Sequence, residues 1–136
     1  MNTGSLHTDR AVEAQAAARP HVLVAEDDVY IARGLALALG TDFDVSVRSS
    51  ASDFARSFGL IRPDVMLVDY RLPDMTGVDL LSMLRREHGS EVPAVMVSAH
   101  VHRAHAALSA GFDVFLAKPF GGRELIRALH RAMSKG

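Results

Sequence analysis

The sequence contains no cysteine and no tryptophan, and only 6% of its residues are aromatic. Without cysteine the chain forms no disulfide, holds no zinc through thiolates and has no cysteine nucleophile. No apolar run approaches the ~20 residues needed to cross a bilayer. The first twenty residues lack the basic-then-apolar order of a secretion signal. These absences are compatible with a reducing compartment, and we expect a cytoplasmic protein without a membrane partner.

An excess of charge of either sign is also lacking. The 136 residues include 15 Lys and Arg and 16 Asp and Glu, so the formal net charge is −1. This balance does not favour direct binding to nucleic acid. With 49% hydrophobic residues, the composition suits one globular domain with a real core. Residues 1–20 are Ala-rich with almost no apolar stripe, so we expect a mobile N-terminal extension before one domain over residues 21–136.

Short apolar runs alternate with stretches of helical apolar spacing along the domain. Most of these runs lack polar alternation and end at turn signals, which is typical of strands buried on both faces. Only residues 44–48 alternate as an edge strand would. Repeated strand-then-helix units predict an α/β fold, a five-stranded parallel sheet that is doubly wound as (βα)5. The predicted strands cover residues 21–25, 44–48, 65–69, 93–98 and 114–117.

Local signals also predict where the helices begin and end. Asp28 is expected to cap the helix over residues 29–39, in which Ile31 and Ala38 belong to the predicted apolar face. Gly59 is expected to end the next helix.

Polar residues lie at the ends of four of the five predicted strands. Glu26 and Asp27 follow the first strand, Asp69 ends the third, Ser98 ends the fourth and Lys118 follows the fifth. The carboxyl ends of parallel strands lie along one edge of a sheet, where ligands bind. Clustered carboxylates without a soft ligand suit a hard cation such as Mg2+.

A carboxylate beside a divalent cation and an ammonium group can attack phosphorus and form an aspartyl phosphate. The segment around Asp69 alone does not decide between this role and that of an Asp that only shapes a turn. The other strand ends favour the reactive carboxylate.

Four motifs in order resemble those of bacterial two-component response-regulator receiver domains, which have a flavodoxin/CheY-like fold. They are Val-x-Glu-Asp-Asp, Asp-x-x-Leu-Pro-Asp-Met-x-Gly, Val-Ser-Ala and Gly-Phe-Asp-x-Phe-x-x-Lys-Pro-Phe, within residues 21–135. The resemblance implies that Asp69 is the phosphoacceptor and that Lys118 and Ser98 contact the phosphoryl group. It also implies an Mg2+ site formed by Glu26, Asp27, Asp69 and the backbone carbonyl of Arg71.

The resemblance assigns regulatory roles as well. Phe115 would be the aromatic switch whose rotamer follows Ser98, although plain core packing is an equal alternative. Arg71 and His100 would border the phosphoryl group and influence its lifetime, whereas pairing with a surface acid is the alternative for Arg71. A cis peptide bond before Pro119 is usual in the family.

The implied function is a switch that takes phosphate from a histidine kinase or a histidine phosphotransfer protein. It would then regulate a downstream protein target through the face of the fourth helix, the fifth strand and the last helix, which also serves homodimers in the family. We expect a receiver without a DNA-binding output, which is no enzyme beyond its own phosphorylation and dephosphorylation. The alternative is a constitutive interaction module that no longer switches.

Two enzyme classes fit the sequence less well. A haloacid-dehalogenase-type phosphohydrolase needs a second Asp two residues after the nucleophile, where this chain has Arg71. A dinucleotide enzyme needs a glycine-rich turn after the first strand, where this chain has acids.

Two further groups of charged residues are assigned to the surface. Three histidines between residues 100 and 105 lack a nearby acid to complete a metal site, so we interpret them as surface residues. Basic residues recur at every fourth position of the last helix. We favour a solvated outer face over an acidic partner or phosphate contacts for this stripe, which consists of Arg123, Arg127, Arg131 and Lys135.

Overall fold

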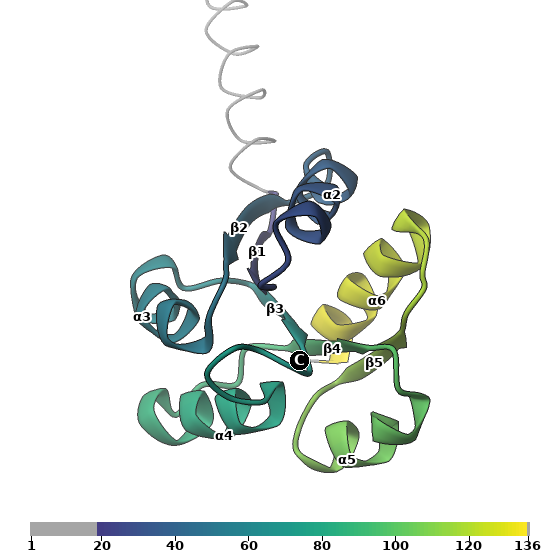
Figure 1. Cartoon of the computed structure of the whole chain (residues 1–136). Coiled ribbons are helices and arrows are strands. Elements are labelled where there is room, and N and C mark those ends of the chain that lie inside the picture. Colours follow the sequence, from purple (N-terminus) through teal and green to yellow (C-terminus); the bar gives the residue numbers. More distant parts are fainter. Residues whose placement is uncertain (1–18, 136) are drawn as a thin grey trace, which may run out of the picture.

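A computed structural model describes residues 19–135, so the N-terminal extension predicted for residues 1–20 lies almost entirely outside the described residues (Figure 1). The five strands are β1 (His21–Ala25), β2 (Asp44–Arg48), β3 (Val65–Asp69), β4 (Ala94–Ser98) and β5 (Val114–Ala117). The helices are α2 (Val29–Leu39), α3 (Ala51–Ile61), α4 (Gly77–His88), the 3-10 turn η1 (Val101–Arg103), α5 (Ala104–Ser109) and α6 (Gly122–Lys135).

The strands form one sheet in the order β2-β1-β3-β4-β5, and every neighbouring pair is parallel. Helices α2 and α6 cover one face, while α3, α4 and α5 cover the other (Figure 1). The predicted doubly wound (βα)5 fold is therefore confirmed. Strand order reverses between β1 and β3, and such a switch point leaves a crevice for ligands beyond the strand ends.

The core consists of two apolar layers separated by the sheet. Leu23 and Met66 face the layer under α3 and α4, whereas Val22 and Leu67 face the layer under α2 and α6. All four side chains are at most 1% exposed. Successive strand side chains point to opposite faces, so an unbroken apolar run fills both layers at once.

The two edge strands differ from expectation. All five residues of β2 are half-buried. The predicted alternation of buried and exposed side chains along this strand is therefore wrong, because α2 and α3 both contact the strand. β5 was expected to be buried on both faces, but it lies at the opposite edge, and only Val114 is fully buried there.

The end of α3 corrects the prediction at Gly59. The helix continues to Ile61, and Arg62 at φ 54° ends it by donating its N–H to the carbonyl of Phe58. Gly is tolerated inside a helix at a cost of about 1 kcal/mol. Phe58 anchors the helix in the core, and Pro63 opposes helical backbone at Arg62, so the helix ends there.

Helix α2 begins as predicted but presents a different face. The Asp28 carboxylate accepts hydrogen bonds from the N–H groups of Tyr30 and Ile31, so the predicted cap is confirmed. Ile31 is 42% exposed and Ala38 is also exposed, so both assignments to the buried face are wrong. Only one narrow stripe of α2, ending at Leu39, reaches the core.

Among residues 19–135, no helix combines the length and apolar character required to cross a bilayer.

Candidate functional site

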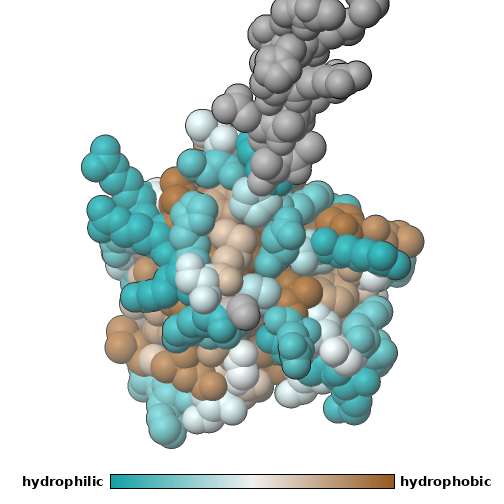
Figure 2. All heavy atoms as spheres, turned by 180° about the vertical axis from the view of Figure 1, so that it is seen from behind, coloured by the Kyte–Doolittle hydropathy of each residue, from teal (hydrophilic) through white to brown (hydrophobic). Residues whose placement is uncertain are grey.

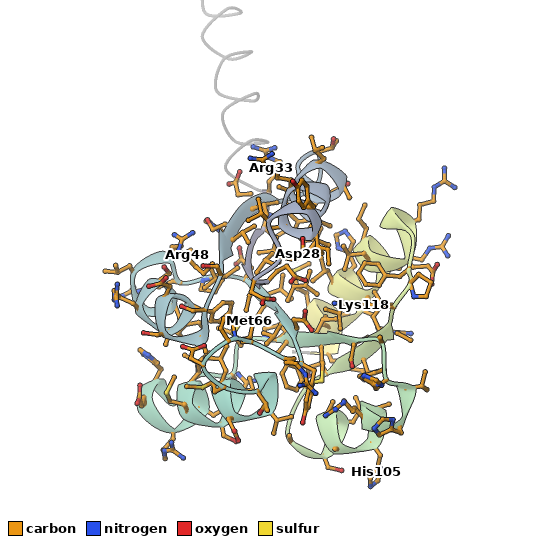
Figure 3. All side chains as sticks on the ribbon, in the orientation of Figure 1. Asp28, Arg33, Arg48, Met66, His105 and Lys118 are labelled. Carbon is orange, nitrogen blue, oxygen red and sulfur yellow. The ribbon has the colours of Figure 1, made fainter. Side chains whose placement is uncertain are left out.

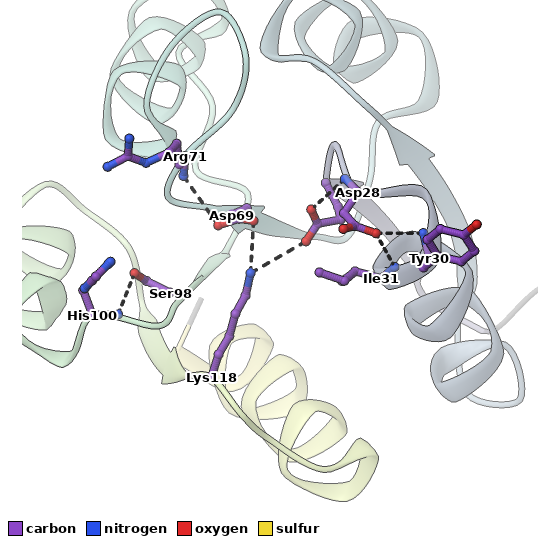
Figure 4. A network of polar contacts seen from close by, with 9 residues as sticks. Asp28, Tyr30, Ile31, Asp69, Arg71, Ser98, His100 and Lys118 are labelled. Carbon is purple, nitrogen blue, oxygen red and sulfur yellow. Dashed lines mark hydrogen bonds and ion pairs between the residues drawn. The ribbon is translucent and has the colours of Figure 1, made fainter.

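The sequence-predicted carboxylates meet at the carboxyl ends of β1 and β3. Glu26 and Asp27 follow β1, Asp69 is the last residue of β3, and one oxygen of each lies within 4.8 Å of the others. Lys118 reaches them from the end of β5 (Figure 4). Its Nζ lies 3.1 Å from Asp69 Oδ2 and 3.8 Å from Glu26 Oε1.

The position of Lys118 depends on its backbone. Its N–H donates to the carbonyl of Ser98 at 2.9 Å, and the peptide bond to Pro119 is cis, as the sequence resemblance predicted. The ends of β1, β3 and β5 therefore supply one compact group of three acids and an ammonium.

Glu26 carries the strongest electrostatic perturbation in the site. Glu26 is only 2% exposed, and this burial raises the pKa of its carboxyl to about 7. The Asp28 N–H opposes this rise, the Asp69 charge adds to it, and the Lys118 charge opposes it. Glu26 Oε1 is buried and has no hydrogen-bond partner among residues 19–135. A buried carboxylate oxygen without a donor is costly unless a cation lies beside it.

The donor set therefore fits a hard divalent cation. Three carboxylates offer oxygens only, and the orphaned Glu26 oxygen needs positive charge beyond the Lys118 ammonium at 3.8 Å. Oxygen ligands without sulfur or imidazole favour Mg2+. Beside the acids lies an open pocket of about 500 Å3, also lined by Arg71 and Pro73.

Ser98 is 3% exposed at the end of β4, and its Oγ accepts the N–H of His100 at 3.1 Å. The Arg71 side chain points away from Asp69, and the His100 ring lies beyond Ser98 (Figure 4). Arg71 approaches Asp69 through its backbone instead, with its N–H 3.5 Å from Asp69 Oδ1. The sequence resemblance placed both residues beside the phosphoryl group, and this role stays a prediction.

A stacking contact that sequence reasoning missed joins these two loops. The Arg103 guanidinium lies 3.6 Å from the centre of the Tyr70 ring, which is cation–π geometry. Tyr70 directly follows Asp69, and Arg103 ends the 3-10 turn η1 that precedes α5. Residues 33 positions apart gave no sequence signal for this contact.

Phe115 is half-buried on β5. It packs against the core layer under α3 and α4 and also borders a surface hollow with Ala104 and Leu108. Its assignment as a switch stays a prediction.

The histidines of this region belong to the surface group rather than to the acid cluster. The rings of His100 and His102 lie 5.5 Å apart, and His105 projects outward from α5 (Figure 3). Within the described part of the chain, the group of potential metal ligands contains no histidine.

Asp74 anchors the loop after Asp69, a role that sequence reasoning also missed. Its two carboxylate oxygens accept the N–H groups of Ala51 at 2.8 Å and Ser52 at 2.9 Å, at the start of α3. These backbone donors hold the pKa of the Asp74 carboxyl below its usual value, and the hydrogen bond from Ala51 has the largest effect. The loop after Asp69 is thus tied to a helix more than twenty residues earlier in the chain.

We expect Asp74→Ala to lower the free energy of unfolding by about 1 kcal/mol near neutral pH, as loss of other helix caps does. Because the folded pKa lies below the unfolded value of about 3.9, this contribution is complete above that value and is lost as the pH falls through the folded pKa. Urea unfolding of both proteins from pH 7 to pH 2.5 measures it. A difference that stays constant over this range contradicts the assignment.

Residues 22–130 match the family described as the response regulator receiver domain, so this chain belongs to that family. Receiver domains are signalling switches rather than classical enzymes. They bind Mg2+ in an acidic pocket and interact with histidine kinases or phosphotransfer proteins, and the cluster of Glu26, Asp27 and Asp69 is compatible with such a pocket.

Curated relatives and a solved structure agree with this assignment. The chain is 34% identical over 111 residues to the DNA-binding response regulator MtrA of Mycobacterium tuberculosis, covering 79% of this chain and 48% of MtrA. It is 36% identical over 118 residues to the transcriptional regulatory protein CseB of Streptomyces coelicolor, covering 85% and 50%. The receiver domain of the Francisella response regulator 1452 superposes with a TM-score of 0.78 at 28% identity, covering 85% of this chain and 98% of that one.

The chain thus spans about half the length of the curated relatives it matches.

Proposed function

We propose that this chain is a phosphorylation-controlled switch that accepts a phosphoryl group on Asp69. The observation that carries the proposal is the contact of Lys118 Nζ with Asp69 Oδ2 at 3.1 Å, inside a cluster of three acids. The ammonium is placed to offset negative charge on a phosphoryl group that arrives at Asp69. The donor would be a phosphohistidine of a kinase or of a phosphotransfer protein.

In the transfer step, an Asp69 oxygen forms a bond to phosphorus while the bond between phosphorus and the donor histidine nitrogen breaks. The electron pair of the broken bond stays on the imidazole. The Mg2+ ion, held by Glu26, Asp27, Asp69 and the Arg71 carbonyl, would supply charge neutralisation for the transferring group. Lys118 and the Ser98 hydroxyl would bind its oxygens.

The switch itself would act through Ser98 and Phe115. A phosphoryl oxygen that accepts a hydrogen bond from the Ser98 hydroxyl would draw Ser98 toward Asp69 and stretch the bond in which Ser98 Oγ accepts the His100 N–H. Movement of this loop would let Phe115 turn inward and change the α5–β5–α6 face. A phosphoryl group shifts such an equilibrium only by its differential affinity for the two states.

The test is incubation of the full chain with acetyl phosphate, followed by intact-mass measurement. We expect one added phosphoryl group with Mg2+ and none after chelation. No incorporation under either condition would favour the alternative, a constitutive interaction module with this fold.

The lifetime of the phosphoryl group is a further expectation. The loops after β3 and β4 carry Arg71 and His100 where a carboxylate or amide could orient a hydrolytic water. We therefore propose slow self-dephosphorylation. The double variant Arg71→Asn with His100→Glu should lose its label several-fold faster in timed measurements at one Mg2+ concentration. An equal or longer lifetime contradicts this role.

MtrA is a DNA-binding and CseB a transcriptional regulator, and this chain covers about half of each, so the expectation that this chain makes no nucleic-acid contact stays a prediction.

A further inference from the structure

Arg103 is held by an aromatic ring rather than by an acid. In the view from behind, hydrophilic side chains project from several edges of the molecule, as charged surface groups usually do (Figure 2). Arg103 is instead half-buried, and its guanidinium lies 3.6 Å from the centre of the Tyr70 ring. Its Nε is buried without a hydrogen-bond partner among residues 19–135, and no acid in that part of the chain forms an ion pair with it. The ring is therefore the group that fixes this cation.

The stacking contact completes a chain of contacts that begins at Ser98. Ser98 Oγ accepts the N–H of His100 at 3.1 Å (Figure 4), and the His100 carbonyl accepts the N–H of Arg103 at 3.0 Å. The Arg103 side chain then returns to Tyr70, which directly follows Asp69. The segment of residues 98–103, the Ser98 loop, is thus anchored at one end by β4 and at the other by the residue beside the acid cluster.

The stacking contact matters more to the Ser98 loop than to Tyr70. Tyr70 has other anchors, because its N–H donates to the Val97 carbonyl at 3.1 Å and its carbonyl accepts the Gly77 N–H at 2.6 Å. Its side chain also packs against the core layer under α3 and α4. The 3-10 turn η1, by contrast, contains no buried residue and has no side-chain cap at its start. Without the ring, little else would hold Arg103 and this turn in place.

Such an anchor opposes movement of Ser98 toward Asp69. Only four residues separate Ser98 from Arg103, so a displacement of Ser98 pulls on His100 and on the turn that carries Arg103. The turn can follow only if the guanidinium slides along the ring or leaves it. A cation–π contact is of modest strength, and the orphaned Nε counts against the stacked position. The contact therefore suits a restraint that a new phosphoryl contact can overcome.

We propose that Arg103 is a positioning residue whose contact with Tyr70 restrains the Ser98 loop and slows the approach of Ser98 to Asp69. That phosphorylation releases this restraint rests on the proposed function, whereas the restraint itself rests on the contacts of the loop.

Amide hydrogen exchange in the unphosphorylated full chain tests the restraint, measured by NMR at the N–H groups of His100 and Arg103. Tyr70→Leu keeps apolar bulk but removes the ring, so both amides should exchange on the order of tenfold faster. Arg103→Met removes the charge and should have the same effect at His100. Tyr70→Phe keeps the ring face and should exchange as the wild type does. Arg103→Lys keeps a cation near the ring and should restore part of the protection.

The double variant Tyr70→Leu with Arg103→Met separates one shared contact from two independent packing effects. If both residues act through the same contact, the His100 amide should exchange as fast in the double variant as in either single variant. The Gly89 N–H, which donates to the Arg85 carbonyl at the end of α4, is the internal control and should be unchanged. Unchanged exchange at His100, additive effects or faster exchange at Gly89 as well would overturn the restraint.

Labelling by acetyl phosphate measures the consequence for the switch. At one Mg2+ concentration, Arg103→Met should take up the phosphoryl group several-fold faster than the wild type, because Ser98 can approach without breaking the stacking contact. The matched control is Arg86→Met, which removes an exposed arginine on α4 and should be labelled at the wild-type rate. Slower labelling of Arg103→Met would show that the contact organises the site instead, and would overturn the proposal.

The two measurements separate this proposal from the proposed function. A chain that shows the exchange effects but takes no phosphoryl group would keep the restraint and lose the switch. A chain that is labelled on Asp69, with exchange and labelling rates that Arg103→Met leaves unchanged, would keep the switch and lose the restraint.

Discussion

Replacing Asp69 with Ala should abolish phosphoryl incorporation from acetyl phosphate or from a phosphorylated kinase. Asp69 provides the carboxylate that lies both in the acid cluster and beside Lys118 Nζ, at 3.1 Å. Lys118 keeps Glu26 as a partner in this variant, so the fold should persist. Intact-mass measurement should detect no added phosphoryl group, and circular dichroism should show an unchanged helix content.

The matched control for this variant is Asp79→Ala, an exposed acid in the first turn of α4. It should take up the phosphoryl group to the wild-type extent. If the Asp69→Ala protein is still labelled to a similar extent, another residue is the acceptor and the assignment is wrong.

Replacing Gly77 with Ala should destabilise the domain by about 3 kcal/mol, a large share of the usual stability of a domain. A Cβ atom at this position would lie 2.6 Å from the carbonyl oxygen of Asp69 and 2.9 Å from Val68 Cγ1. The N–H of Gly77 also donates to the Tyr70 carbonyl at 2.6 Å, so the start of α4 packs directly against the loop after Asp69. The melting temperature should fall by on the order of 10 °C.

Gly34 in α2 gives a control of opposite sign. A Cβ there would meet no atom within 4 Å, so Gly34→Ala should raise the free energy of unfolding by about 0.5 to 1 kcal/mol. Thermal unfolding of the two variants beside the wild type measures both effects. A Gly77→Ala protein as stable as the wild type would show that the loop after Asp69 yields to the added methyl group.

Local sequence by itself determined the sheet and the residues at its ends. The unbroken apolar runs indicated strands buried on both faces, and parallel strands place their carboxyl ends on one edge. Glu26, Asp27, Asp69 and Lys118 could therefore be expected together from their positions after these runs, and the structure places them within ion-pair or metal-binding distances. The Asp28 cap was predictable for the same reason, because its hydrogen bonds reach only two and three residues along the chain.

Tertiary packing alone decided the features that depend on distant residues. Gly59 continues a helix because Phe58 is held in the core, and Ile31 stays exposed because α2 turns only a narrow stripe inward. The contacts from Asp74 to α3 and from Arg103 to Tyr70 join segments far apart in sequence. The side-chain direction of Arg71 was decided in the same way. Periodicity and capping rules describe neighbours a few residues apart, whereas these contacts arise only when separate elements pack together.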